Sequence, residues 1–339
     1  MPATPLVPPP RPLRVDMHAH FYPAAYLEAV GQSAGEISLR TEPSGRRVFC
    51  RGEAKVAALN PPAVDPALRL EAMDAAGVQV QALSLTFPSV NFLPPRQGAS
   101  LARVANDALA DVTRGSGGRF VGLAAVAQKD AGLAAAELTR SVERLGLRGA
   151  IVFSNIDGVY LDDPSQRPLL ERAAALGVPL LLHPMAPPST QGMADYWLTP
   201  ILGMEFEVML ALGRLIFTGT LERLPGLRLV ASHLGGGLPF LQGRMDHGYE
   251  VHPDCRQHIA KPPSAYLRQV HYDAVAFHPP ALRCAVESVG ADRLVLGSDF
   301  PQAMGDLAGT VKAIEGLDVP AAEREAIFER AGALLGIVP

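Results

Sequence analysis

The stretch Val15-Asp16-Met17-His18-Ala19-His20 decides how the rest of this chain is interpreted. It begins as a short apolar strand and ends in two histidines that are separated by one residue. Because side chains alternate between the two faces of a strand, His18 and His20 point the same way. Two imidazoles in this arrangement either bind one metal ion or form a surface pair beside a turn, and the later strands decide between these possibilities.

Length and composition describe an ordinary globular chain. Its 339 residues are 48% hydrophobic and 19% charged, and the net charge of −4 gives no reason to expect nucleic acid as a partner. The apolar runs are too short or too interrupted by charge to span a membrane. The three cysteines, Cys50, Cys255 and Cys284, match neither a disulfide framework nor a zinc motif and suit a reducing compartment. We therefore expect a cytoplasmic protein.

We expect residues 1–339 to form one domain with two irregular segments. Residues 1–13 are rich in proline and lack an apolar core segment, which predicts a loose arm and not a secretory signal. Residues 31–66 depart from the later pattern, and their segments Glu36–Glu42 and Arg47–Arg51 resemble the arms of a β-hairpin. We predict that 31–66 is an insertion over the mouth of the fold.

From Pro66 onward, apolar strands alternate with helices. Runs such as Leu180-Leu181-Leu182 are typical of parallel strands buried on both faces. The predicted strands are Val15–His18, Val78–Thr86, Phe120–Val126, Leu147–Phe153, Pro179–His183, Leu227–His233, Val270–Val275 and Arg293–Ser298. The predicted helices are Tyr26–Val30, Pro66–Ala76, Leu101–Arg114, Ala131–Leu145, Pro164–Leu176, Ile201–Leu224, Phe240–Glu250, Pro279–Val289, Leu307–Ile314 and Ala321–Leu335.

Eight strands with helices between them predict a closed barrel. An open doubly wound sheet is the alternative, but it would need a phosphate-binding glycine loop after its first strand. Met17–Pro23 contains no glycine. The sequence therefore predicts an α/β chain folded as a distorted (β/α)8 TIM barrel, with a small β-hairpin insertion after strand one.

Polar residues stand where several predicted strands end. His18 and His20 end strand one, His183 ends strand five, His233 ends strand six, and Asp299 follows strand eight. Each alone could be a turn former, a strand-end residue or a loop cap. In a (β/α)8 barrel, however, the carboxyl ends of all strands meet at one rim. Imidazole and carboxylate are ligands for zinc, manganese and similar ions, so the joint pattern predicts a metal site.

The complete pattern resembles the amidohydrolase superfamily. Four motifs carry the resemblance: His18-Ala19-His20, His183-Pro184, His233-Leu234-Gly235-Gly236-Gly237 and Gly297-Ser298-Asp299-Phe300-Pro301. They look most like the branch of aminocarboxymuconate-semialdehyde decarboxylase and related metal-dependent aromatic-acid decarboxylases. The resemblance covers nearly the whole chain from Arg14 but does not specify one substrate. Further matching segments are Asp65–Gln81, Arg119–Leu123, Tyr196–Leu198 and Gly243–Gly248.

The resemblance implies a role for each matching position. His18, His20, His183 and Asp299 would hold one divalent metal ion, with zinc as the usual ion of the family and manganese or cobalt as alternatives. His233 would be the acid or base beside the metal, and Asp299 would share in moving the proton. These implied roles make the chain an enzyme whose partner is a small-molecule carboxylic acid.

The resemblance also implies a homodimer. Arg244 matches an arginine that family members supply to the neighbouring subunit's site, where it holds a substrate carboxylate. The alternative is a surface arginine that pairs with Asp246 or Glu250.

Three positions depart from the family pattern. The arginine expected directly after Val48-Phe49 is replaced by Cys50, and Arg51 comes one residue later, which reverses its side chain unless a bulge corrects the register. A tryptophan is replaced by Pro200 and an aromatic residue by Gln302. The substrate-binding candidates are Arg244, Arg51, Trp197, Gln302 and His278, of which the last follows strand seven.

We therefore favour non-oxidative decarboxylation of an aromatic or unsaturated carboxylic acid. A hydrolase or hydratase is the alternative within enzymes, because the same metal-bound water attacks a lactone, an amide or a double bond. A non-catalytic metal-binding barrel is a third possibility, against which the complete ligand set and His233 argue.

Overall fold

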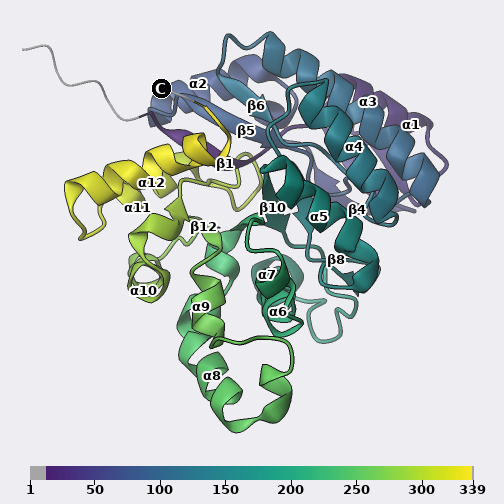
Figure 1. Cartoon of the computed structure of the whole chain (residues 1–339). Coiled ribbons are helices and arrows are strands. Elements are labelled where there is room, and N and C mark those ends of the chain that lie inside the picture. Colours follow the sequence, from purple (N-terminus) through teal and green to yellow (C-terminus); the bar gives the residue numbers. More distant parts are fainter. Residues whose placement is uncertain (1–12, 338–339) are drawn as a thin grey trace, which may run out of the picture.

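The computed structural model describes residues 13–337 (Figure 1). The predicted loose arm, apart from Leu13, lies outside the described residues. Parallel strands form two hydrogen-bonded sheets, with the orders β1-β5-β6 and β13-β12-β11-β10-β7. These strands are β1 (Val15–His20), β5 (Val80–Ser84), β6 (Phe120–Gly122), β7 (Ala150–Phe153), β10 (Pro179–His183), β11 (Arg228–Ala231), β12 (His271–Asp273) and β13 (Leu294–Val295).

Backbone hydrogen bonds join the two sheets at both seams. At one seam, the amide of His20 donates to the carbonyl of Phe300 over 2.8 Å, just beyond β13. At the other, the amide of Ala124 donates to the carbonyl of Gly149 over 2.8 Å, beside a parallel bridge between Ala124 and Ala150. The predicted distorted (β/α)8 barrel is therefore confirmed, and the sparse pairing at these seams is where it is distorted.

Alternate residues of each strand face the inside and the outside of the barrel. In β10, Leu181 packs in an interior cluster with Met17 of β1 and Val230 of β11. Its neighbours Leu180 and Leu182 belong to the larger cluster that lies under the helices. This arrangement explains the unbroken apolar runs, because both faces of a parallel barrel strand are buried.

Helices cover the outside of the barrel, and none within residues 13–337 is long and apolar enough to cross a membrane. Local signals fix their ends: Asp65 caps α2 by accepting from two backbone amides, and Gly77, with φ of 68°, ends it. The helices are α1 (Ala24–Gln32), α2 (Pro66–Ala76), α3 (Pro95–Arg114), α4 (Ala131–Glu143), α5 (Arg167–Leu176), α6 (Met204–Phe217), α7 (Thr220–Arg223), α8 (Leu238–Val251), α9 (Pro263–Leu267), α10 (Pro279–Val289), α11 (Leu307–Glu315) and α12 (Ala321–Leu334).

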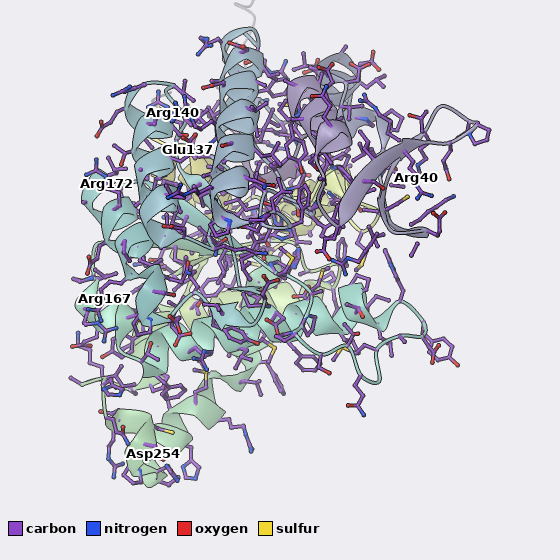
Figure 2. All side chains as sticks on the ribbon, turned by 90° about the vertical axis from the view of Figure 1, so that its right-hand side faces the viewer. Arg40, Glu137, Arg140, Arg167, Arg172 and Asp254 are labelled. Atoms are coloured by element: carbon purple, nitrogen blue, oxygen red, sulfur yellow. The ribbon has the colours of Figure 1, made fainter. Side chains whose placement is uncertain are left out.

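Ion pairs connect neighbouring helices of this outer layer. Arg140 of α4 pairs with Asp107 of α3 over 2.6 Å, and Arg172 of α5 pairs with Glu143 of α4 over 3.2 Å. Figure 2 shows Arg140 and Arg172 along one flank of the molecule.

Several elements differ from the sequence prediction. The single helix predicted for Ile201–Leu224 is divided into a π-helical turn at Thr199–Gly203, then α6 and α7, because Gly219 adopts a left-handed φ of 70° between the last two. A short hairpin of β8 (Asn155–Ile156) and β9 (Val159–Tyr160) was not predicted, and neither was α9. These segments are too short to show a sequence period.

The predicted hairpin arms belong to a three-stranded antiparallel sheet of β2 (Ile37–Thr41), β3 (Arg47–Arg51) and β4 (Ala54–Ala58). A register shift between Phe49 and Cys50 marks a β-bulge. The sheet packs through buried residues such as Phe49, whose ring lies 5.6 Å from that of Tyr22. Beside it, the Asn60 side chain donates to the carbonyl of Pro301 over 2.6 Å. That residues 1–339 form one domain, with 31–66 over its mouth, stays a prediction.

Candidate metal centre and active site

The four predicted metal ligands meet at the carboxyl ends of three strands. His18 and His20 lie on β1, His183 ends β10, and Asp299 follows β13. One ligand atom from each residue lies within 4.8 Å of the other three, and all four residues are buried. Oδ1 of Asp299 is 2.9 Å from Nε2 of His20 and 3.4 Å from Nε2 of His18.

Contacts behind the β1 histidines fix which ring nitrogen carries the proton. Nδ1 of His18 lies 2.6 Å from the carboxylate of Asp273, which accepts. Nδ1 of His20 lies 3.0 Å from the hydroxyl of Ser84, and this hydroxyl donates to the carbonyl of Ala19. When both rings are neutral, their Nε2 atoms therefore carry lone pairs, yet these atoms face each other at 3.0 Å.

His183 and Asp299 add two more electron-rich atoms to the cluster. Nδ1 of His183 lies 2.9 Å from the carbonyl of Pro184, which only accepts, so Nε2 of His183 is also unprotonated. Oδ1 of Asp299 is buried without a hydrogen-bond donor. Three lone pairs and one carboxylate oxygen repel each other unless a cation lies among them. The donor set therefore fits a divalent metal ion.

The protonation states of the ligands suit metal binding. Burial lowers the pKa of His20 to about 4 and the pKa of His183 well below its ordinary value, so both imidazoles are neutral at pH 7. Burial would raise the pKa of Asp299, but the surrounding imidazoles of His20 and His18 hold it below its ordinary value. Neutral imidazole and ionised carboxylate are the forms that bind a metal ion.

The motif Gly297-Ser298-Asp299 has a separate physical reason for each residue. A Cβ atom at Gly297 would lie 2.5 Å from the Cβ of Asp273 and 3.0 Å from that of His18, so only glycine fits. The hydroxyl of Ser298 donates to buried Asp16 over 2.6 Å. Asp299 has φ of 56°, a left-handed conformation that aspartate tolerates better than most residues.

His233 lies beside the cluster but outside the ligand set. Its Nε2 atom is 3.9 Å from Oδ2 of Asp299, and its ring centroid is 5.3 Å from that of His18. Its Nδ1 atom is 2.9 Å from Oε1 of Glu205 on α6. Burial alone would lower the pKa of His233, but the Glu205 carboxylate outweighs it and raises this pKa to about 10.

A polar network behind the ligands was not predicted from the sequence. Arg69 of α2 is fully buried and donates to the carbonyl of His20 and, over 2.8 Å, to the side chain of Gln81. Gln81 in turn donates to Asp16 over 2.8 Å. Burial lowers the pKa of Arg69 to about 9 and raises the pKa of Asp16 to about 6. The signal for this network was the presence of Asp16 and Gln81 within the apolar strands β1 and β5.

Of the five predicted substrate-binding residues, one lies beside the metal-ligand cluster, and the other four form no hydrogen bond or ion pair with it in the described part of the chain. Gln302 lies near the cluster, because its backbone amide donates to the carbonyl of Asp299 over 3.0 Å. Arg51 is exposed and pairs with Glu36 over 3.3 Å, although the β3 bulge is present. Within residues 13–337, the hydrogen bonds and ion pairs of the cluster include none of Arg51, Trp197, Arg244 and His278.

A buried metal-ligand cluster at the rim of a (β/α)8 barrel defines the class of this protein, and the chain belongs to the amidohydrolase family, whose model matches residues 15–337. It is 31% identical over 302 residues to the 2-amino-3-carboxymuconate-6-semialdehyde decarboxylase of Dictyostelium discoideum, covering 88% of this chain and 84% of that protein. It is 34% identical over 255 residues to the gamma-resorcylate decarboxylase of Rhizobium radiobacter, covering 69% of this chain and 76% of that protein.

A solved structure extends the likeness to three dimensions. The dihydroxybenzoic acid decarboxylase from a Polaromonas species, with bound manganese and the inhibitor 2-nitroresorcinol, matches with a TM-score of 0.77 at 27% identity. The match covers 96% of this chain and 97% of that one. The resemblance to the decarboxylase branch of the superfamily is therefore confirmed.

Proposed function

We propose that this chain is a metal-dependent, non-oxidative decarboxylase of an aromatic or unsaturated carboxylic acid. The observation that carries the proposal is the convergence of His18, His20, His183 and Asp299 at the barrel rim, with His233 beside them. The relatives described above are decarboxylases, which favours this activity over hydrolysis or hydration by the same kind of site.

The four ligands would hold one divalent ion. We propose zinc, which suits neutral imidazole and carboxylate donors, with manganese and cobalt as alternatives. The bound manganese of the Polaromonas relative supports manganese as the first alternative. When bound, such an ion polarises a substrate oxygen and lowers the pKa of a water molecule.

His233 would provide the proton that the reaction requires. Decarboxylation breaks the bond between a carbon atom and its carboxylate, releases carbon dioxide, and leaves that carbon to take up a proton. Nε2 of His233 faces the cluster, 3.9 Å from Asp299, and its other ring nitrogen faces Glu205. It is therefore placed to deliver the proton by general acid catalysis, with Asp299 on its cluster side.

We propose that the active unit is a homodimer in which Arg244 enters the partner's pocket and orients the substrate carboxylate. Arg244 lies exposed on α8, which extends away from the barrel in Figure 1. The two acidic residues that could pair with it have other contacts: Asp246 accepts from the amide of Ser264 over 2.9 Å, and Glu250 lies 3.6 Å from His247.

The remaining substrate-binding candidates have different support. Gln302 is supported by its position beside Asp299, whereas Arg51, Trp197 and His278 are exposed. We propose that these exposed residues complete the pocket when two subunits meet. The free thiols of the chain fit our proposal that the protein works in the reducing cytoplasm.

A substrate panel tests this function. The chain, loaded separately with zinc, manganese or cobalt, is incubated with 2,6-dihydroxybenzoate, with 2-amino-3-carboxymuconate 6-semialdehyde, and with a lactone and an amide. We expect carbon dioxide release and the matching decarboxylated product from a carboxylic acid. Ring opening of the lactone or cleavage of the amide, without carbon dioxide release from any acid, would contradict the proposal.

A further inference from the structure

The segment that carries His233 has an unusual backbone. Four consecutive residues have positive φ angles, with φ of 53° at His233, 55° at Leu234, 68° at Gly235 and 63° at Gly236. The first two are not glycine, so the backbone is strained at the residue that faces the metal ligands. Such a conformation persists only when the surrounding structure fixes it.

Helix α6 provides this support through close packing. A Cβ atom at Gly236 would lie 2.7 Å from the carbonyl oxygen of Glu205 and 2.6 Å from the side chain of Met209. A Cβ atom at Gly235 would lie 2.8 Å from the ring of Tyr272 and 3.2 Å from Leu212. Glycines at these positions therefore let the His233 loop lie directly against α6, with the backbone of Glu205 at the contact.

The same contact places the Glu205 side chain against the imidazole. Nδ1 of His233 is buried, and Oε1 of the Glu205 carboxylate lies 2.9 Å from it in an ion-pair contact. Within residues 13–337, the Glu205 side chain makes no ion pair other than this one. Its side chain is 30% exposed, so it stands at the edge of the site and not in the core.

We propose that Glu205 is a positioning residue for His233, an inference that rests on the proposed function of this histidine. The carboxylate holds a proton on Nδ1 and fixes the ring plane, so that Nε2 is directed at the metal-ligand cluster and the substrate. The contact depends on α6 and on the segment His233–Gly236 together, because the close packing of these two elements brings the carboxylate to the imidazole.

Glu207 offers a matched control on the same helix. It is buried, unlike Glu205, and its carboxylate accepts from Asn155 over 2.6 Å and from Tyr160 over 3.0 Å. Glu205→Gln and Glu207→Gln remove one negative charge each from positions two residues apart, and only the first change touches His233.

The first test needs no substrate. Nitrogen-15 shifts of the histidine rings are recorded for the zinc-loaded full chain, with His233→Ala used to assign the His233 signals. We expect Nδ1 of His233 to carry a proton in the unchanged protein and in Glu207→Gln, and to lose it in part in Glu205→Gln. Unchanged His233 shifts in Glu205→Gln would overturn the inference.

The second test measures turnover of the best acid from the substrate panel. Glu205→Gln should lower kcat about 10–100-fold, the range in which supporting hydrogen-bond partners act, with little change in KM. Glu205→Asp should restore part of the loss, and Glu207→Gln should resemble the unchanged enzyme. Glu205→Gln should have no further effect in a His233→Ala background, because the carboxylate acts through that imidazole.

The outcomes separate this inference from the proposed function. Normal turnover by His233→Ala would reject the role of His233 itself. If His233→Ala is impaired and Glu205→Gln has a normal kcat, only the positioning role of Glu205 is rejected. The same conclusion follows if Glu205→Gln and Glu207→Gln lower kcat equally.

Discussion

The metal-ligand cluster and the outer edge of the site are built in opposite ways. The four ligands are at most 8% exposed, and Asp273, Ser84 and the carbonyl of Pro184 hold the three imidazole rings through their Nδ1 atoms. The loop before α6 and helix α8, which we propose form the outer edge of the site, are exposed: Tyr196 is 87% exposed and Phe240 is 81% exposed. The four proposed ligands all come from one chain, whereas the exposed aromatic side chains suit the second subunit that we propose binds there.

This contrast assigns chemistry and recognition to different regions. In the proposed function, the buried cluster holds the metal and His233 donates the proton, because polar atoms inside a barrel need defined partners. The exposed edge carries Arg244 and Trp197, whose side chains are free to meet different ligands or a second subunit. We expect changes at the cluster to abolish activity and changes at the edge to alter substrate affinity.

The largest expected effect is at the cluster. His18→Ala removes one of three imidazole donors and should abolish both metal retention and turnover. Metal analysis after gel filtration gives the readout, with His247→Ala on the exposed face of α8 as the control. We expect about one ion per chain in the unchanged protein, and full metal content in His18→Ala would refute the ligand assignment.

His233→Ala should come next in size. The variant should keep its metal, because His233 lies outside the ligand set, and should lose about 10²–10⁴-fold in kcat, the usual contribution of an acid or base. Metal content and kcat are measured on the same preparation. Loss of the metal in this variant would make His233 a fifth ligand instead.

The contrast also explains what the sequence could predict. His18, His20, His183 and Asp299 were predictable because each stands where an apolar strand ends, and a barrel brings all strand ends to one rim. Arg51 was ambiguous for the opposite reason, since its direction depends on a bulge in the β3 strand and on pairing with Glu36.

Residues that act through tertiary contacts left a weaker signal. Asp273 ends the short strand β12, and the absence of a side chain at Gly297 leaves room for it to lie against His18. Glu205 lies inside a helix, 28 residues before His233 in the chain, and only the folded loop joins the two. Strand β4 was missed because its alanines and lysine do not show a β-type alternation.

Asp273→Asn should produce an intermediate effect behind the cluster. Its carboxylate accepts from Nδ1 of His18, and an amide in its place can donate to that nitrogen and put the proton on Nε2, where the metal binds. We expect about 10–100-fold weaker metal binding, measured by competition with a chelator. The control is Asp254→Asn, a residue labelled at the bottom of Figure 2. Equal metal affinity in both variants would mean that Asp273 does not set the tautomer.

Arg244→Ala should have the smallest effect on metal binding and proton transfer. Its effect on KM is nevertheless the one that tests whether two subunits share a site. Loss of a charged hydrogen bond to a carboxylate is worth about 1.5–3 kcal/mol, so KM should rise about 10–150-fold at most while metal content stays full. Arg228→Ala, an exposed arginine at the amino end of β11, is the control. A rise in KM for both variants would point to a general charge effect and not to a specific contact.

The decisive form of this prediction mixes two impaired variants, His233→Ala and Arg244→Ala. If Arg244 serves the partner's pocket, a heterodimer contains one site in which both residues are intact, and activity should reappear as subunits exchange. If Arg244 serves its own chain, every site in the mixture lacks one of the two residues, and activity stays low. Subunit exchange is followed separately by native mass spectrometry, so that exchange without recovery places the arginine within its own subunit and leaves the exposed edge without its proposed catalytic partner.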